Sequence, residues 1–204
     1  ATLIEEDEYG YTRPRRGQVY KADILAITES DVIVDLGTKR DGIVPPKDLG
    51  FLNEEYLDSL EVGDSVPVVV LKTWGNDDEL VVSLNKGLEQ EDWLRAQDLF
   101  ENEQVVEAEV TDFNRGGVLV SFGRLQGFVP NSHLTSIPRG LQGNRLKEAK
   151  AELVGETLSL AVIEVNQRRR RLILSERAAK RHQRQQLLQE LTEGEVRSGV
   201  VRNL

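Results

Sequence analysis

The sequence predicts a mainly β protein in which two small five-stranded barrels are joined by short α-helices. The first observation is a repeat: residues 30–45 read SDVIVDLGTKRDGIVP, residues 115–130 read RGGVLVSFGRLQGFVP, and both runs end in glycine, two apolar residues and proline. The second is that residues 62–83 align with residues 154–175 without a gap. The third is a hydrophobic share of only 39% in 204 residues, which favours several small cores over one large core.

Each copy contains five short β-branched segments bounded by glycine or charged residues, a pattern typical of strands. They are residues 18–27, 32–36, 42–45, 65–72 and 79–84 in the first copy, and residues 104–113, 118–122, 127–130, 157–164 and 170–175 in the second. The one non-strand insertion follows the third strand. This order suits a Greek-key barrel of the OB type, whose closure leaves no exposed sheet edge. Gly37 and Gly123, just before the third strands, are expected in tight turns because glycine adopts positive φ freely.

Two segments change from strand to helical periodicity. The first places Trp93, Ala96 and Phe100 on one helix face, and the second does the same with Leu187, Leu188 and Leu191 among strong helix formers. The predicted organisation is therefore an acidic tail (1–16), a barrel (17–87), a helical linker (88–103), a second barrel (104–177), a second helical linker (178–193) and the first strand of a third repeat (194–204).

Charge is distributed unevenly along the chain, whose net charge is −9. Residues 17–87 contain six Lys and Arg against fourteen Asp and Glu, whereas residues 104–177 contain eleven against eight. The overall acidity at first argues against nucleic acid, whose protein partners usually present a basic surface. Because the acidity belongs to the first copy, the second copy remains a candidate nucleic-acid binder.

Several classes of site are not expected. The absence of Cys excludes disulfides and thiolate metal ligands, two His residues make a histidine metal site unexpected, and no apolar run is long enough for a membrane span or a signal peptide. No Gly-rich nucleotide-phosphate loop or Gly-x-Ser-x-Gly motif is present, and carboxylate pairs such as Asp77 and Asp78 fall at turn tips. We therefore expect no enzyme activity, no cofactor and no small-molecule substrate.

The Gly-apolar-apolar-Pro turn and the Val-Gly-Asp/Glu opening of the fourth strand resemble features of the S1 RNA-binding domain. RGGVLVSFGRLQGFVPNSHL (115–134) resembles the second repeat of the ribosomal protein S1 family. NQRRRRLILSERAAKRHQRQQLLQELTEGEVRSGVVRNL (166–204) resembles the passage from that repeat into a third. The barrels are thus expected to be S1-type OB folds, in an order similar to the N-terminal part of that family.

The resemblance implies a non-enzymatic role in translation. In that family, the N-terminal part anchors to the small ribosomal subunit, here beside a neighbouring ribosomal protein, and later repeats capture single-stranded mRNA. A cytoplasmic, ribosome-associated protein is expected, or one in an organellar stroma. Two alternatives stay open: an S1-repeat RNA-binding regulator that does not dock on ribosomes, and an accessory region of a ribonuclease or of polynucleotide phosphorylase. The tandem copies disfavour the second alternative, because those enzymes usually carry a single copy.

One departure from the S1 pattern predicts weak RNA contact. Strong S1 repeats carry an aromatic pair around the second strand, and those places hold Gly116 and Leu119 in the second copy and Ser30 and Ile33 in the first. Stacking of a base on an aromatic ring contributes about 1–3 kcal/mol. This part of the chain is therefore expected mainly to anchor to the ribosome.

The candidate RNA-binding residues lie in the second copy. Arg168, Arg169, Arg170 and Arg171 occupy the turn between its last two strands, where the first copy has Asn-Asp-Asp-Glu (76–79). Arginine binds phosphate through a planar, bidentate set of donors, although a charged turn tip that only aids solubility is the alternative. Arg115 and Arg124 flank the second strand and are either phosphate contacts or exposed charges.

Aromatic and histidine side chains could offer flat faces to bases in the same copy. Phe128 is a candidate RNA contact, but barrel core is the favoured interpretation for Phe113 and Phe128, and Phe122 is expected in the core outright. For His133, a surface role near RNA is favoured over a metal site, because no second ligand lies at suitable spacing.

The first copy is expected either to be a solvated acidic barrel or to dock a ribosomal protein. Tyr9 and Tyr11, in an acidic tail, and Asp77 and Asp78, at a turn tip, are its candidate docking residues. A disordered tail is the alternative in isolation, since a segment of this composition cannot bury enough apolar surface to fold by itself.

Overall fold

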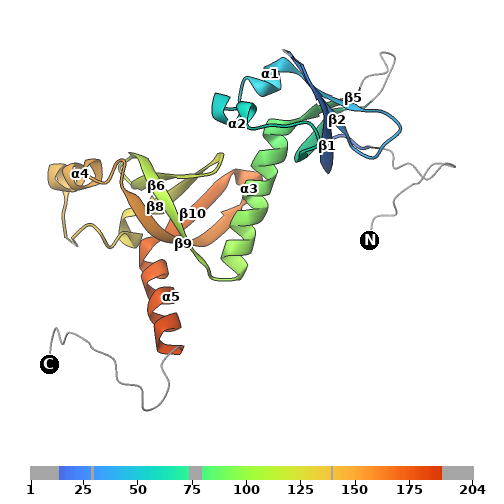
Figure 1. The fold of residues 1–204 in the computed structure, drawn as a ribbon. Helices are drawn as coiled ribbons and strands as arrows, with labels where there is room; N and C mark the ends of the chain where they lie inside the picture. Colours follow the sequence, from blue (N-terminus) through green and yellow to red (C-terminus); the bar gives the residue numbers. More distant parts are fainter. Residues whose placement is uncertain (1–13, 29, 74–79, 139, 190–204) are drawn as a thin grey trace. The chain divides into compact units, whose positions relative to one another are not determined.

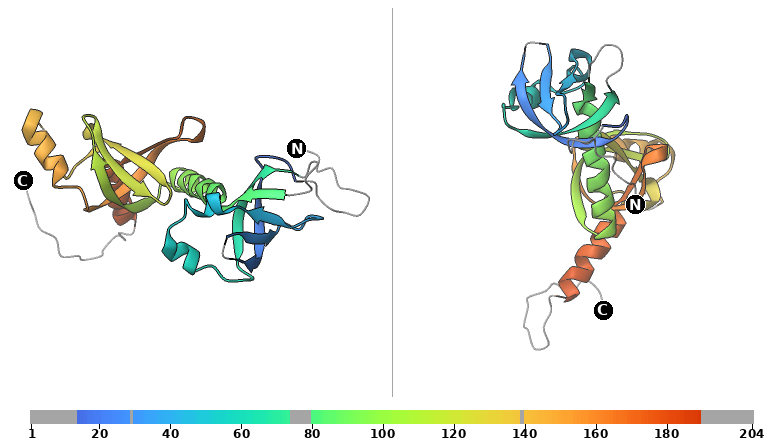
Figure 2. Two further views of the ribbon diagram at one scale, coloured as in Figure 1. Left: turned by 90° about the horizontal axis from the view of Figure 1, so that it is seen from above. Right: turned by 90° about the vertical axis from the view of Figure 1, so that its right-hand side faces the viewer.

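The computed structural model describes residues 14–28, 30–73, 80–138 and 140–189 (Figure 1). The chain divides into two compact units, residues 1–94 and residues 95–204, and each contains one closed β-barrel (Figure 2). Among the described residues, no helix combines the length and the apolar character needed to cross a membrane.

The first barrel, called barrel one, closes in the strand order β1-β2-β3-β5-β4. Strands β3 and β5 are parallel and the other neighbours are antiparallel. Two short helices, α1 (Pro46–Leu49) and α2 (Glu54–Asp58), form the insertion after the third strand. The strands are β1 (Val19–Ile27), β2 (Val32–Asp35), β3 (Gly42–Val44), β4 (Ser65–Lys72) and β5 (Leu80–Ser83).

The second barrel, called barrel two, repeats this topology in the order β10-β8-β7-β6-β9. Its insertion contains the short 3-10 helix η1 (Asn131–His133) and a longer helix, α4 (Gly143–Ala151). The prediction of tandem five-stranded barrels joined by a helix is confirmed. The strands are β6 (Val105–Phe113), β7 (Gly117–Phe122), β8 (Leu125–Pro130), β9 (Thr157–Asn166) and β10 (Arg171–Ser175).

The shared glycines have two different roles. Gly37 and Gly123 adopt positive φ of 68° and 56°, as expected for tight turns. The glycines of the Gly-apolar-apolar-Pro run are needed for close packing instead. A Cβ on Gly42 would lie 2.7 Å from Cδ1 of Leu36, and one on Gly127 would lie 2.3 Å from Cδ1 of Leu174. The repeated run is therefore a scaffold feature that keeps the barrel interior narrow.

Helix α3 (Leu84–Glu101) follows barrel one directly. Trp93 and Ala96 are buried as expected, but Phe100 is 40% exposed and Leu99 is buried in its place, so the prediction for Phe100 was wrong. Helical periodicity identifies the apolar face of a helix, but it does not indicate how far along that face the neighbouring surface extends.

Helix α5 (Glu176–Gln189) follows barrel two. Its buried side chains include Ala178, Ala179 and His182, whereas Leu187 is 56% exposed, so the prediction that Leu187 lies on the packed face was wrong. The side chains of Leu188 and Leu191 lie outside the described part of the chain. Residues 1–13 of the predicted acidic tail and the predicted third-repeat strand at residues 194–204 lie outside it as well.

Candidate nucleic-acid interface on barrel two

The outward face of the β7–β8 pair carries two apolar side chains side by side. In the register of this antiparallel pair, Leu119 lies opposite Phe128, with Ser121 opposite Gln126 on one side and Gly117 opposite Pro130 on the other. Leu119 and Phe128 are half-buried and alternate with fully buried neighbours. This face therefore presents a small apolar patch, at the place where an OB fold binds oligonucleotides.

The ring of Phe128 extends over a pair of glycines. Its Cζ lies 2.9 Å from the point that a Cβ on Gly117 would occupy, and 3.4 Å from the equivalent point at Gly116. Gly116, at one of the two places of the expected aromatic pair, and the neighbouring Gly117 thus leave room for a ring from the next strand. In barrel one, Ser30 occupies the place of Gly116 and Ile43 that of Phe128, so this aromatic feature belongs to barrel two.

The core interpretation was wrong for two of the three phenylalanines. Phe122 is buried at 4% exposure, as expected. Phe128 and Phe113 are only half-buried, because each lies at an outward position or at a strand end. The pattern of apolar residues around Phe113 and Phe128 is compatible with a core position and with an outward or strand-end position. Sequence periodicity therefore could not decide between the two positions.

The arginine turn has a defined backbone. The 3-10 helix η2 (Gln167–Arg169) is capped by Asn166, whose Oδ1 accepts a hydrogen bond of 3.1 Å from the amide of Arg169, and Arg170 adopts positive φ of 50°. All four arginine side chains are exposed. Nε of Arg171 lies 3.8 Å from Oε1 of Glu164, an exposed pair of the kind that contributes little to stability.

Strand directions decide which of the candidate residues share one end of the barrel. Strand β10 runs parallel to β8, with Ile173 beside Phe128. The turns that precede these strands, carrying Arg168 to Arg170 and Arg124, therefore lie at the same end. Arg115 precedes β7, which is antiparallel to β8, and so lies at the opposite end. The structure thus places cations at both ends of the face that carries Phe128.

His133 contacts the barrel rather than the outward face. Its Nδ1 lies 2.9 Å from Oγ of Ser175, and that oxygen also accepts a hydrogen bond of 3.0 Å from the amide of Ala178 at the start of α5. This contact gives His133 a structural role between η1 and α5 that the sequence analysis did not anticipate.

Glu176 forms a buried hydrogen-bond cluster that sequence reasoning also missed. Its Oε2 accepts from the amides of Thr135 (2.6 Å) and Ser136 (2.9 Å), and its Oε1 accepts from Oγ of Ser136 and Nζ of Lys180, both at 2.7 Å. Burial alone would raise the pKa of Glu176, but these hydrogen bonds lower it to about 2. No periodic signal marks this cluster, because its members lie far apart in the sequence.

Four predicted docking residues lie outside the described residues: Tyr9, Tyr11, Asp77 and Asp78. The remaining candidates divide by position. Phe128 lies on the outward face, Arg124 and the four-arginine turn lie at one end of it, and Arg115 lies at the other, whereas His133 is engaged in packing.

A family profile described as the S1 RNA binding domain matches residues 13–85 and residues 99–177. The chain belongs to the S1 RNA-binding domain family. Its two S1 domains correspond to barrel one and barrel two. This is a family of RNA-binding domains and not an enzyme family.

Curated small ribosomal subunit proteins are similar to this chain over nearly its whole length. The small ribosomal subunit protein bS1 homolog of Bacillus subtilis is 32% identical over 197 residues, which cover 94% of this chain and 49% of that protein. The small ribosomal subunit protein bS1 of Synechococcus elongatus is 28% identical over 191 residues, covering 93% of this chain and 60% of that protein. The chain thus spans about half the length of the curated relatives that it matches.

A solved structure is also similar to this chain over most of its length. It is a multidomain protein with nucleic acid binding domains from Streptococcus pneumoniae, which is 21% identical, has a TM-score of 0.31, and covers 80% of this chain and 52% of that one.

Proposed function

We propose that barrel two binds single-stranded RNA without sequence preference, across the outward face of β7 and β8. The observation that carries the proposal is the ring of Phe128 on a face with arginines at both ends. Bases stack on aromatic rings whatever their identity, and arginines bind the phosphates that connect them. Strand β8 has six residues, which at about 3.3 Å per residue span roughly 17–20 Å, enough for a few nucleotides.

Binding of labelled oligouridine to the full chain tests this function. Replacing Phe128 with leucine keeps an apolar side chain but removes the ring, so affinity should fall about tenfold, within the range for one stacked base. Phe100→Leu is the matched control, because Phe100 is also exposed and lies on α3. Equal affinities of the wild type and both variants would reject Phe128 as a stacking platform. Absence of binding by the wild type would reject the function itself.

We further propose that the chain acts in translation on the small ribosomal subunit, as a non-enzymatic anchoring part. The names of its relatives support this proposal, since small ribosomal subunit proteins bS1 match along nearly the whole chain. An S1-repeat regulator that does not dock on ribosomes is the remaining alternative. It would bind RNA equally well but would not sediment with ribosomal subunits.

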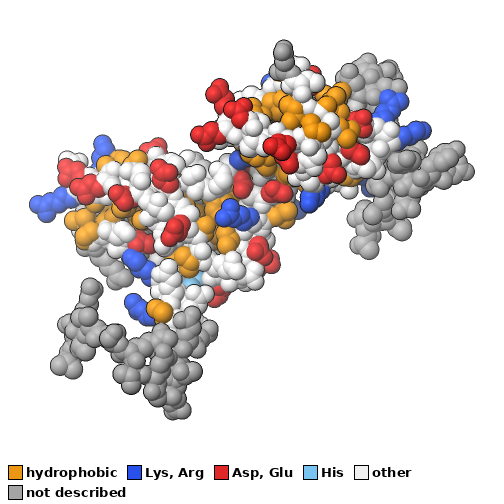
Figure 3. Space-filling model, viewed as in Figure 1, with side chains coloured by type: hydrophobic (Ala, Val, Ile, Leu, Met, Phe, Trp, Pro, Cys, Tyr) orange, Lys and Arg blue, Asp and Glu red, His pale blue; other side chains and the backbone are white. Residues whose placement is uncertain are grey.

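Barrel one is the proposed docking part, and its partner is a basic neighbouring ribosomal protein. Leu25, Ile27, Phe51 and Val62 are between 43% and 65% exposed on this barrel. In Figure 3, hydrophobic side chains gather on barrel one among Asp and Glu side chains. Such a patch with an acidic border suits a partner that offers apolar side chains within a basic surface. Tyr9, Tyr11, Asp77 and Asp78 remain proposed docking residues in the undescribed segments.

Co-sedimentation with purified small subunits tests the ribosomal role separately from RNA binding. We expect the wild type to sediment with the subunits and Phe51→Asp to do so less, because a carboxylate on the patch opposes burial. Lys47→Asp is the control: Lys47 is an exposed cation on α1 and not one of the four apolar residues of the patch, and the change also adds a carboxylate. Failure of the wild type to sediment at moderate salt would reject the ribosomal role and leave RNA binding standing.

A further inference from the structure

A pocket lies beside barrel two, between α4 and the turn that joins β6 to β7. Its volume is about 620 Å³, which is within the range of pockets that bind small organic ligands. Phe113 and Leu146 form its apolar part. Arg115, Lys147 and Lys150 contribute three cations to its lining, and no Asp or Glu lines it. The lining thus combines a flat apolar surface with positive charge, which suits a planar ring attached to an anion.

Lys150 is a buried cation without a carboxylate partner among the described residues. It is 3% exposed, its Nζ donates a hydrogen bond to the carbonyl oxygen of Asn114, and the same nitrogen lies 5.8 Å from the centroid of the Phe113 ring. Burial lowers the pKa of Lys150, because a charged group loses hydration there. An ammonium group has three donors, so Lys150 can still donate to an acceptor that enters the pocket.

The turn that borders the pocket is held in place before any ligand binds. Oδ1 of Asn114 accepts hydrogen bonds from the amides of Gly116 (2.8 Å) and Gly117 (3.1 Å). From the other side, Nδ2 of Asn131 donates to the carbonyl oxygen of Arg115 at 2.9 Å. A preformed site loses less conformational entropy on binding, so Arg115 and the Phe113 ring are well placed to contribute affinity.

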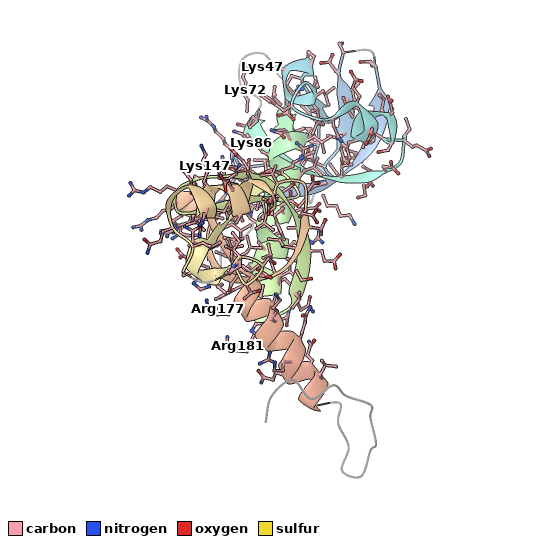
Figure 4. The ribbon with its side chains drawn as sticks, turned by 90° about the vertical axis from the view of Figure 1, so that its left-hand side faces the viewer. Lys47, Lys72, Lys86, Lys147, Arg177 and Arg181 are labelled. Carbon is pink, nitrogen blue, oxygen red and sulfur yellow. The ribbon has the colours of Figure 1, made fainter. Side chains whose placement is uncertain are left out.

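The start of α4 adds to the positive potential of the pocket. Gln142 and Gly143 line it, and Gln142 is the N-cap residue without a side-chain hydrogen bond to the first turn. Uncapped amides at a helix N-terminus favour an anion. Lys147, one turn further along α4, is exposed (Figure 4). Helix α4 therefore supplies both its uncapped first turn and the charges of Lys147 and Lys150.

Barrel one has the opposite charge at the corresponding positions. Counting back with the spacing of the gapless alignment, Glu55 and Asp58 of α2 correspond to Lys147 and Lys150. Ile27, the last residue of β1, corresponds to Phe113, the last residue of β6. A pair of cations beside a ring is therefore not a requirement of the barrel fold. It is a property of barrel two, the barrel for which RNA binding is proposed.

We propose that this pocket binds one nucleotide of a single-stranded RNA, with its base against Phe113 and Leu146 and its phosphate among Arg115, Lys147 and the first turn of α4. The assignment rests on the proposed RNA-binding function. Arg115 connects the two sites, since it lies at one end of the β7–β8 face and also lines the pocket. An RNA strand that leaves the face at that end thus meets the pocket next.

The test measures the affinity of the full chain for labelled oligouridine with two independent variants. Phe113→Leu removes the ring and should weaken binding about tenfold, the effect of one stacked base. Lys147→Glu reverses one exposed charge and should weaken binding severalfold and lower its salt dependence. The matched controls are Phe100→Leu and Lys47→Glu, which change the same residue types at exposed places outside the pocket and should leave affinity unchanged. Thermal unfolding checks that each variant keeps its fold.

The outcomes separate the pocket from the general function. Wild-type affinity of both Phe113→Leu and Lys147→Glu would overturn the pocket assignment, and a continued loss of affinity in Phe128→Leu would then leave the proposed function intact. If the wild type does not bind oligouridine, both proposals are overturned together. If free uridine monophosphate competes as strongly per nucleotide as the oligomer, the pocket is a mononucleotide site and the assignment to an RNA strand is wrong.

Discussion

Nδ1 of His133 lies 2.9 Å from Oγ of Ser175, at the point where the segment after β8 meets the start of α5. The repeat places Asp48 and Ser83 at the corresponding positions in barrel one, where Oγ of Ser83 donates to Oδ1 of Asp48 at 2.5 Å. Both serines also accept a hydrogen bond of 3.0 Å from the amide three residues later, so each caps the helix that follows its barrel. The two barrels thus use the same serine cap, with Asp48 as the serine's side-chain partner in barrel one and His133 in barrel two.

This pairing of a capping serine with a side-chain partner predicts different stability losses in the two barrels. Asp48→Ala should lower the free energy of unfolding by about 2–3 kcal/mol, because the buried Ser83 hydroxyl and the amide of Asn85 each lose a charged acceptor. His133→Ala should lower it by about 1 kcal/mol, the contribution of one neutral hydrogen bond. Urea denaturation followed by circular dichroism measures both. RNA affinity should stay at the wild-type value in His133→Ala, and a marked loss would instead return His133 to the RNA interface.

Glu176 predicts an acid-sensitive contribution to the stability of barrel two. Its folded pKa of about 2 lies below the ordinary value of 4.5, so its stabilising effect is fully present above pH 4.5 and is lost as the pH falls toward 2. The difference corresponds to roughly 3 kcal/mol at neutral pH, since one pKa unit is worth about 1.4 kcal/mol. Glu176→Gln should therefore destabilise the chain at pH 7, and the gap from the wild type should close between pH 4.5 and 2.

Glu148→Gln is the control for that measurement, because Glu148 is exposed on α4. It should follow the wild-type curve of unfolding free energy against pH. A constant gap between wild type and Glu176→Gln from pH 7 to 2 would show that the carboxylate charge of Glu176 does not stabilise the fold.

Gly117 and Gly116 provide a matched pair for the packing of the Phe128 ring. A Cβ on Gly117 would lie 2.1 Å from the carbonyl oxygen of Val129 and 2.9 Å from Phe128, whereas a Cβ on Gly116 would meet Phe128 only at 3.4 Å. Gly117→Ala should therefore lower the free energy of unfolding by about 1–3 kcal/mol, as overpacking does. Gly116→Ala should stay within about 0.5 kcal/mol of the wild type, like most surface substitutions. Equal stability of the two variants would contradict this account of the turn.

The sequence was sufficient to predict the strands because their signal is local. Alternating β-branched residues mark β4 at residues 65–72, and the gapless repeat carries the same assignment to β9. The positive charge of the arginine turn could also be predicted, because four consecutive arginines are a local signal in the sequence. Phe128 could be identified as a candidate RNA contact from the sequence, but its outward position could not be predicted. The corresponding residues Ile43 and Phe128 are both apolar, and an apolar residue at this position can face either the core or solvent.

The contacts that the sequence did not predict join distant residues. His133 and Ser175 lie 42 residues apart, and Lys150 reaches the carbonyl oxygen of Asn114 across 36. A lysine near the end of a helix gives no local sign that it will be buried against a turn. The placement of Arg124 and the arginine turn at the same end also required the observed strand directions, because it follows from the parallel pairing of β10 with β8. Periodicity describes single elements, whereas these relationships arise from closure of the barrel.

The arginine turn predicts a salt dependence of RNA binding that distinguishes phosphate contacts from a solubilising turn. Each phosphate contact with single-stranded nucleic acid contributes a slope of about −0.7 in log affinity against log salt. Replacing Arg168 and Arg169 with alanine should therefore make the slope less steep by up to about 1.4. Arg177→Ala with Arg181→Ala is the matched control, because these residues are exposed on α5 and their removal changes the net charge equally (Figure 4).

Phosphate contacts at the arginine turn are indicated only if the two double variants differ in the slope of log affinity against log salt. If both flatten the slope equally, the cations act through the general potential of barrel two and not through contacts at the turn. If neither changes it, Arg168 and Arg169 only solubilise the hairpin. The expected result is a flatter slope in the first variant alone, because of these two arginine pairs only Arg168 and Arg169 lie, by the strand directions, at an end of the face that carries Phe128.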